Sequence, residues 1–179
     1  MQTLVVFLRA VNVRPRWVKM EPLRQLLTDH GFEGVESYIQ SGNLRLSTPI
    51  RSADKVATTV AHLIEAEYGF AVPCVVRTPK RLREVLTEAH SHISPLPGAE
   101  LRRYVTFCAE TPGDDATAVL NGWDVPGERV QVRSREIHWW LAKPAHEATL
   151  TNGRIEKLVG VATTRDLKVV DALADRWGA

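Results

Sequence analysis

The hydrophobic positions in the first half of the chain form short strand-like runs and helical stripes. Leu4–Leu8 is a continuous apolar run, typical of a strand buried on both faces. Between Met20 and His30, leucines recur at helical spacing, which predicts an amphipathic helix that Gly31 and Phe32 end in a Schellman-type cap. The other elements expected here are two strands, a helix that Ser52 caps and Gly69 ends, and a last strand: Val35–Gln40, Leu44–Ser47, Ser52–Gly69 and Val72–Val76.

This order is β-α-β-β-α-β, the split βαβ arrangement of ferredoxin-like domains. The sequence therefore predicts an α+β fold with a ferredoxin-like subdomain over residues 1–78. A second α+β subdomain over residues 79–179 is expected to pack on the first and to end in two helices. We find no internal sequence repeat.

The second half has a less regular pattern. Thr78-Pro79 starts a helix, a loop is expected at His90–Gly98, and the last helix is predicted to begin at Thr163, where Thr163 and Asp166 match a capping box. Arg165 would then lie in the first turn of that helix. Between the loop and the last helix we expect a strand, a short helix, a hairpin and the first of the two final helices: Tyr104–Ala109, Asp114–Leu120, Val130–Arg133 with Ile137–Leu141, and Thr151–Val159.

Composition narrows the classes of protein. The chain has 179 residues with 44% hydrophobic and 25% charged residues, which is ordinary for a globular protein. The net charge of +2 is much lower than the net positive charge typical of a dedicated nucleic-acid-binding protein. Cys74 and Cys108 lie in apolar runs, so we expect buried free thiols. The apolar run at the start is too short for a signal peptide or a membrane span, so we expect a cytoplasmic protein without membrane association.

Three motifs carry a resemblance to a known family: Phe7–Val13 (FLRAVNV), Tyr38–Asn43 (YIQSGN) and Thr164–Asp166 (TRD). The chain resembles, nearly from end to end, the bacterial family catalogued as domain of unknown function 1697. The resemblance implies a two-part α+β fold with a ferredoxin-like first half, and it implies no reaction. The family usually has Arg-Gly-Ile-Asn-Val-Gly-Gly after the first strand, whereas this chain has Ala10 and then Arg14-Pro15.

Topology predicts a candidate site. In a β-α-β-β-α-β sheet the first two strands run in the same direction, so the loop after strand one lies beside the turn between strands two and three, near the start of the first helix. The loop carries Arg9, Arg14, Arg16 and Lys19 without an acid. Guanidinium groups beside a helix N-terminus suit a phosphate or carboxylate. The expected ligand-binding residues are Arg9, Asn12, Gln40, Ser41 and Asn43, joined by Arg165 through the family analogy.

Three functional hypotheses remain open. The first is a binding protein for a small anionic or nucleotide-like ligand at this edge. The second is an enzyme that uses the same edge, for which the sequence names no base or nucleophile. The third is weak nucleic-acid binding through the basic loops. Against all three stands the structural alternative that Gln40, Ser41 and Asn43 only bond the backbone of their own turn.

Other candidate residues have structural interpretations that we prefer. His90 and His92 have a spacing seen in metal sites, but a solvated helix end explains them better, so we expect no metal. His138 is expected on the polar face of a hairpin, and at least one of Trp139 and Trp140 is expected to be partly exposed, because neighbours on a strand point in opposite directions. Nucleotide-loop, dinucleotide, serine-hydrolase, zinc-protease and C-x-x-C motifs do not occur, and no cofactor is expected.

Overall fold

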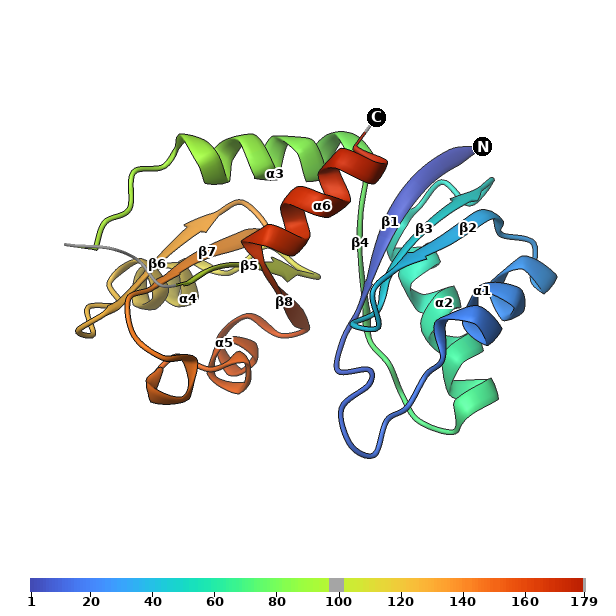
Figure 1. The fold of residues 1–179 in the computed structure, drawn as a ribbon, viewed down its shortest axis with the longest axis horizontal. Coiled ribbons are helices and arrows are strands. Elements are labelled where there is room, and N and C mark those ends of the chain that lie inside the picture. The colour runs from blue at the N-terminus through green and yellow to red at the C-terminus, as the bar shows by residue number, and fades with distance from the viewer. Residues whose placement is uncertain (97–101, 179) are drawn as a thin grey trace. The chain divides into compact units, whose positions relative to one another are not determined.

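A computed structural model describes residues 1–96 and 102–178. The chain divides into two compact units (Figure 1). The first unit comprises Met1–Leu82 and the residues from Arg176 onward, and the second comprises Arg83–Asp175. Contacts of the C-terminal residues with the first unit include a hydrogen bond and a cation–π contact: Trp177 Nε1 donates to Glu36 Oε2 at 3.0 Å, and the Arg176 guanidinium lies 4.7 Å from the Tyr38 ring centroid.

The first unit is ferredoxin-like, as the sequence predicts. Its strands pair antiparallel in the order β2-β3-β1-β4. Because β1 and β2 are both antiparallel to β3, they run in the same direction. The elements, in chain order, are β1 (Gln2–Leu8), α1 (Met20–Asp29), β2 (Glu33–Tyr38), β3 (Asn43–Thr48), α2 (Ala53–Tyr68) and β4 (Cys74–Arg77).

The core of this unit follows from the periodicity of β1 and the two helices. Leu4, Val6 and Leu8 point to one face of the sheet and pack in the same cluster as the apolar stripes of α1 and α2. Val5 and Phe7 on the opposite face are also 0% exposed, so β1 is buried on both faces as predicted. Each fully buried large aliphatic side chain stabilises the fold by about 1.5–3 kcal/mol relative to exposure.

Capping residues begin and end the helices of this unit where the sequence predicts. Gly31 adopts φ +86°, Phe32 N donates to Leu27 O at 3.1 Å, and the Phe32 side chain is buried, which completes the predicted Schellman cap. Ser52 Oγ accepts from Lys55 N at 3.2 Å, and Gly69 ends α2 with φ +77°. These caps satisfy backbone groups that lack helical partners.

The second unit repeats the topology of the first, although the sequence shows no repeat. Its strands pair antiparallel in the order β6-β7-β5-β8, with the same β-α-β-β-α-β chain order. The helix α3 (Pro79–Ser91) precedes this sheet and α6 (Leu167–Trp177) follows it. The remaining elements are β5 (Arg102–Cys108), α4 (Asp114–Asn121), β6 (Glu128–Arg133), β7 (Glu136–Leu141), a 3₁₀ turn (Ala145–Glu147), α5 (Asn152–Val159) and β8 (Ala162–Asp166). Pro97 and Gly98 of the predicted loop lie outside the described residues.

The prediction that the last helix begins at Thr163 is wrong. Residues Ala162–Asp166 form β8, which pairs with β5 along its length, and the helix begins only at Leu167. The β-branched side chains of Thr163 and Thr164 suit a strand, and β5 offers its unpaired edge to them. Asp166 acts at the start of α6 instead, where its Oδ1 accepts from Lys168 N at 2.9 Å.

The expected exposure of the β7 side chains is also wrong. His138 is 0% exposed, Trp139 7% and Trp140 1%. Helices cover both faces of this sheet: α4 and α5 share a cluster with Trp139, whereas α3 and α6 lie across the face that carries His138 and Trp140 (Figure 1). A strand covered on both faces buries consecutive side chains, so the alternation typical of a one-sided sheet does not apply.

Candidate functional site

The loop between β1 and α1 (residues 9–19) and the turn between β2 and β3 (residues 39–42) lie against each other in the first unit. We call this region the basic edge. Asn12 Nδ2 donates to Gln40 O, while Asn12 Oδ1 accepts from Val18 N at 2.9 Å. Leu8 N donates to Gly42 O at 2.8 Å, and Arg9 N bonds Pro73 O at 2.9 Å. The structure therefore brings Asn12 to the turn that carries Gln40, Ser41 and Asn43, with Arg9 at the end of β1.

Gly42 makes this close approach of loop and turn feasible. A Cβ at this position would stand 2.6 Å from Val11 Cγ2 and 2.7 Å from Leu8 Cβ, distances that real Cβ atoms do not adopt. The backbone also has φ +81°, a conformation that glycine adopts without strain. A side chain at this position would separate the turn from β1.

Two of the predicted site residues have structural roles. Asn43 is 0% exposed, and its Nδ2 donates to Tyr38 O at 3.1 Å and to Ser41 Oγ at 3.0 Å. Asn12 ties the loop to the turn through the bonds given above. The structural alternative therefore accounts for the amides of both residues. Gln40 and Ser41 are exposed at the surface of the turn.

The exposed part of the basic edge is cationic and carries an aromatic ring. Arg14 and Lys19 are exposed and Arg16 is half-buried, and Trp17 exposes 61% of its surface. The α1 helix begins after Lys19, whose side chain makes no capping hydrogen bond. The N-terminal N–H groups of α1 therefore add partial positive charge where this loop ends.

Arg165 does not have the surroundings that the sequence predicts. It lies on β8 in the second unit rather than in the first turn of a helix, and it is 7% exposed. Its Nη1 donates to Thr163 Oγ1 at 2.8 Å and to Thr164 O at 3.0 Å. Burial lowers the pKa of this guanidinium to about 10. Arg165 is therefore not a cation at a helix N-terminus, and its contribution to ligand binding stays a prediction.

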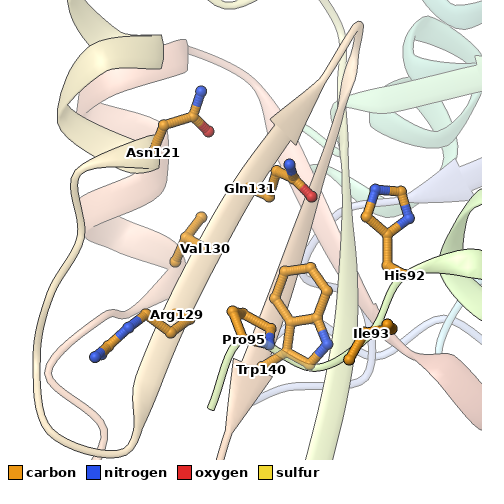
Figure 2. A pocket seen from close by; sticks show the side chains of 8 residues that line it. All are labelled: His92, Ile93, Pro95, Asn121, Arg129, Val130, Gln131 and Trp140. Atoms are coloured by element: carbon orange, nitrogen blue, oxygen red, sulfur yellow. The ribbon is translucent and has the colours of Figure 1, made fainter.

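The second unit contains a pocket of about 470 Å³ at the edge strand β6, and we call it the β6 pocket (Figure 2). No sequence motif indicates this pocket. Strands β6 and β7, the segment after α3 and the end of α4 supply its lining: His92, Ile93, Pro95, Asn121, Arg129, Val130, Gln131 and Trp140. Figure 2 shows the Gln131 amide directed toward His92 and the Arg129 guanidinium directed away from both.

An aromatic and imidazole cluster, in which His138 and Trp140 are buried, adjoins the β6 pocket. The His92 and His138 rings stack with centroids 5.6 Å apart, and the Arg103 guanidinium lies 4.7 Å from the Trp140 centroid. His138 Nε2 lies 4.0 Å from Glu88 Oε2 on α3. One sequence signal could have revealed this cluster: apart from His138, Ile137–Leu141 is a continuous apolar run, typical of a strand covered on both faces.

Glu128 is a buried carboxylate at the start of β6 that ties down the segment after β7. Its oxygens accept from Thr149 N, from Leu150 N at 2.9 Å and from Trp123 Nε1 at 3.0 Å, and Lys143 Nζ lies 2.8 Å away. Burial alone would raise the pKa of Glu128, but these donors outweigh it and hold the pKa below the ordinary value. These backbone and side-chain donors give the Glu128 carboxylate a structural role.

The described residues contain no cluster of three or more His, Cys, Asp or Glu side chains that could hold a metal ion. Within the same residues, no helix combines the length and the apolar character needed to cross a membrane. Cys74 and Cys108 are both buried free thiols, as predicted.

Comparisons with known proteins agree with this architecture. A family model described as "Protein of unknown function (DUF1697)" matches residues 1–138. Among solved structures, the chain is similar to a conserved bacterial protein, SP0830, from Streptococcus pneumoniae, with 20% identity and a TM-score of 0.72. That similarity covers 100% of this chain and 99% of the other, and at this identity it shows the fold alone. No curated protein matches the chain.

Proposed function

The chain belongs to the DUF1697 family of proteins of unknown function, and we propose from its own side chains that it binds a small anionic, nucleotide-like ligand at the basic edge. The observation that carries the proposal is a pair of cations without partners. The guanidinium groups of Arg14 and Arg16 make no ion pair or hydrogen bond with any described residue. Within the loop from Arg9 to Lys19 no acidic residue offsets them.

The surroundings of these two arginines support a ligand with both a phosphate and a ring. Guanidinium groups form short, charge-assisted bonds to phosphate oxygens, and the uncapped start of α1 adds N–H groups of the same polarity. Trp17 follows Arg16 in the loop and is largely exposed, so its indole is available for a base to stack on. Gln40 presents an exposed amide from the adjacent turn.

The loop is also held in place before any ligand binds. The Asn12 bonds to Gln40 and Val18 and the tight packing at Gly42 fix its base. A preorganised loop loses less conformational freedom on binding, which favours a small ligand. An RNA-recognition module is disfavoured, because β3 reads Asn-Leu-Arg-Leu-Ser-Thr and carries no aromatic residue for base stacking.

The proposal is tested by native mass spectrometry of the purified protein and by calorimetric titration with nucleoside mono- and triphosphates. The double variant Arg14→Gln/Arg16→Gln is expected to raise Kd at least about tenfold, since one charge-assisted bond contributes about 1.5 kcal/mol or more. The matched control is Arg51→Gln/Arg154→Gln, which removes two exposed arginines outside the edge and leaves Kd unchanged. An equal loss of nucleotide affinity in both double variants, or no binding of any nucleotide, refutes the proposal.

Two further measurements separate the neighbouring hypotheses. The affinity for a single-stranded oligonucleotide falls steeply with salt if the loop binds a nucleic-acid backbone, whereas the affinity for a mononucleotide falls less. Arg165→Lys keeps the charge but loses the guanidinium fork, so it weakens the nucleotide only if Arg165 takes part in binding. Circular dichroism verifies that each variant is folded.

A further inference from the structure

The β6 pocket has the size and polarity of a small-molecule site, and it is distinct from the basic edge. Its volume of about 470 Å³ falls within the ~300–1,000 Å³ typical of ligand pockets. Ile93, Pro95 and Val130 give it apolar walls, and the indole of Trp140 completes the lining. Ile93 is 92% exposed, so it forms part of the rim.

The first unexplained group in the lining is the Trp140 indole N–H. Trp140 is 1% exposed, and its Nε1 has no hydrogen-bond partner within residues 1–96 and 102–178. Buried indole N–H groups usually have a partner, and an unsatisfied buried donor is destabilising. A ligand acceptor in the pocket would satisfy this group.

Two further side chains give the lining a mixed set of donors and acceptors. The half-buried Gln131 amide makes no hydrogen bond with any described residue, so its donor and its acceptor are both available. His92 Nδ1 bonds the carbonyl oxygen of Glu88, and since a carbonyl only accepts, Nδ1 carries the hydrogen. In the neutral ring Nε2 is therefore an acceptor.

Charge distinguishes this pocket from the basic edge. The Arg129 guanidinium is directed away from Gln131 and His92 (Figure 2). It is already occupied by Asp124 Oδ1 at 2.6 Å and by the carbonyl oxygens of Val125 and Glu128. The described lining residues thus offer no uncommitted arginine to an anion. A neutral ligand with donor and acceptor atoms in one plane matches it better.

We propose that the β6 pocket binds a neutral, planar heterocycle of the nucleobase class, in base or nucleoside form. Trp140 Nε1 donates to a ring acceptor, the Gln131 amide bonds a neighbouring donor–acceptor pair on the edge of the ring, and His92 Nε2 accepts from an exocyclic amine. Ile93 and Pro95 cover the remaining ring surface at the rim.

The test uses ¹⁵N-labelled full-length protein titrated with adenosine, guanosine, cytidine and uridine, with ribose and inorganic phosphate as negative probes. The indole N–H resonances are assigned with Trp139→Phe and Trp140→Phe. Trp139 is the matched control, because its buried indole N–H also has no partner among the described residues but lies beside a different pocket. We expect a nucleoside to shift the Trp140 resonance and to leave the Trp139 resonance in place.

Gln131→Leu keeps the test decisive if Trp140→Phe does not fold. It removes both polar atoms at nearly constant volume and is expected to raise the nucleoside Kd at least about fivefold. Gln25→Leu, at an exposed glutamine of α1 that belongs to neither site, is the matched control and leaves this Kd unchanged. An unmoved Trp140 resonance at saturating nucleoside, an equal shift of Trp139, equal binding of ribose or phosphate, or an unchanged Kd in Gln131→Leu overturns the proposal.

Discussion

Replacing Gly42 by alanine tests how the basic edge is held together. The new Cβ would stand 2.6 Å from Val11 Cγ2 and 2.7 Å from Leu8 Cβ, so side chains of β1 and of the loop after it would have to shift. Forcing a side chain into a packed site costs about 1–3 kcal/mol. The backbone φ of +81° adds about 1–2 kcal/mol for a residue with a Cβ. We expect the free energy of unfolding of the first unit to fall by about 2–5 kcal/mol.

Gly69→Ala is the matched control for this prediction. Gly69 has a nearly identical φ of +77°, but a Cβ there would have no neighbour within 4 Å. Gly69→Ala therefore reports the backbone strain alone, about 1–2 kcal/mol. The difference between the two variants isolates the steric cost of separating the turn from Leu8 and Val11.

The assay is native-state hydrogen exchange of the β1 and β3 amides, which reports on the first unit without interference from the second. Urea unfolding followed by circular dichroism provides an independent stability scale. If Gly42→Ala costs no more than Gly69→Ala, the close packing of turn and loop does not hold the edge, and the reasoning is refuted. We further expect Gly42→Ala to weaken nucleotide binding at the basic edge, because the loop loses its support.

Two further predictions concern buried titratable groups. Glu128→Gln is expected to lower the free energy of unfolding at pH 7 by about 1–3 kcal/mol, since it removes the ion pair with Lys143 and weakens the bonds from Thr149 and Leu150. Because folding lowers the pKa of Glu128 from its ordinary value of 4.5, this contribution is present above that value and disappears as pH falls through the folded pKa. The urea midpoints of the wild-type protein and of Glu128→Gln should therefore converge as the pH is lowered from 7 to 3. A constant difference between the two midpoints would contradict a stabilising role of the ionised Glu128 carboxylate. Burial raises the pKa of the Cys74 thiol to about 12, and Cys108 is 0% exposed, so neither thiol should react with a disulfide reagent at pH 8 until denaturant is added. Rapid reaction of the folded protein would show that these strands open.

Much of the first unit could be predicted from sequence because its signals are local. A Schellman cap depends on residues within one turn of Gly31, and the Ser52 cap depends on a donor three residues away. The continuous apolar run Leu4–Leu8 and the apolar stripes of the two helices predict the order of strands and helices. That order is typical of a ferredoxin-like sheet, from which the strand directions follow. The meeting of Asn12 with the Gln40 turn then followed from the direction of the strands.

What the sequence did not predict depends on partners far along the chain. Thr163–Asp166 carries a helix-start pattern, yet it forms a strand because β5, some 60 residues earlier, offers an unpaired edge. His138 and Trp140 are buried because α3, which ends at Ser91, covers the face of the sheet that a hairpin alone would expose. The β6 pocket exists because of that same covering. By itself the sequence determined caps, periodicities and element order, which act over a few residues; only the tertiary structure decided which faces are covered, because burial is a property of elements brought together by the fold.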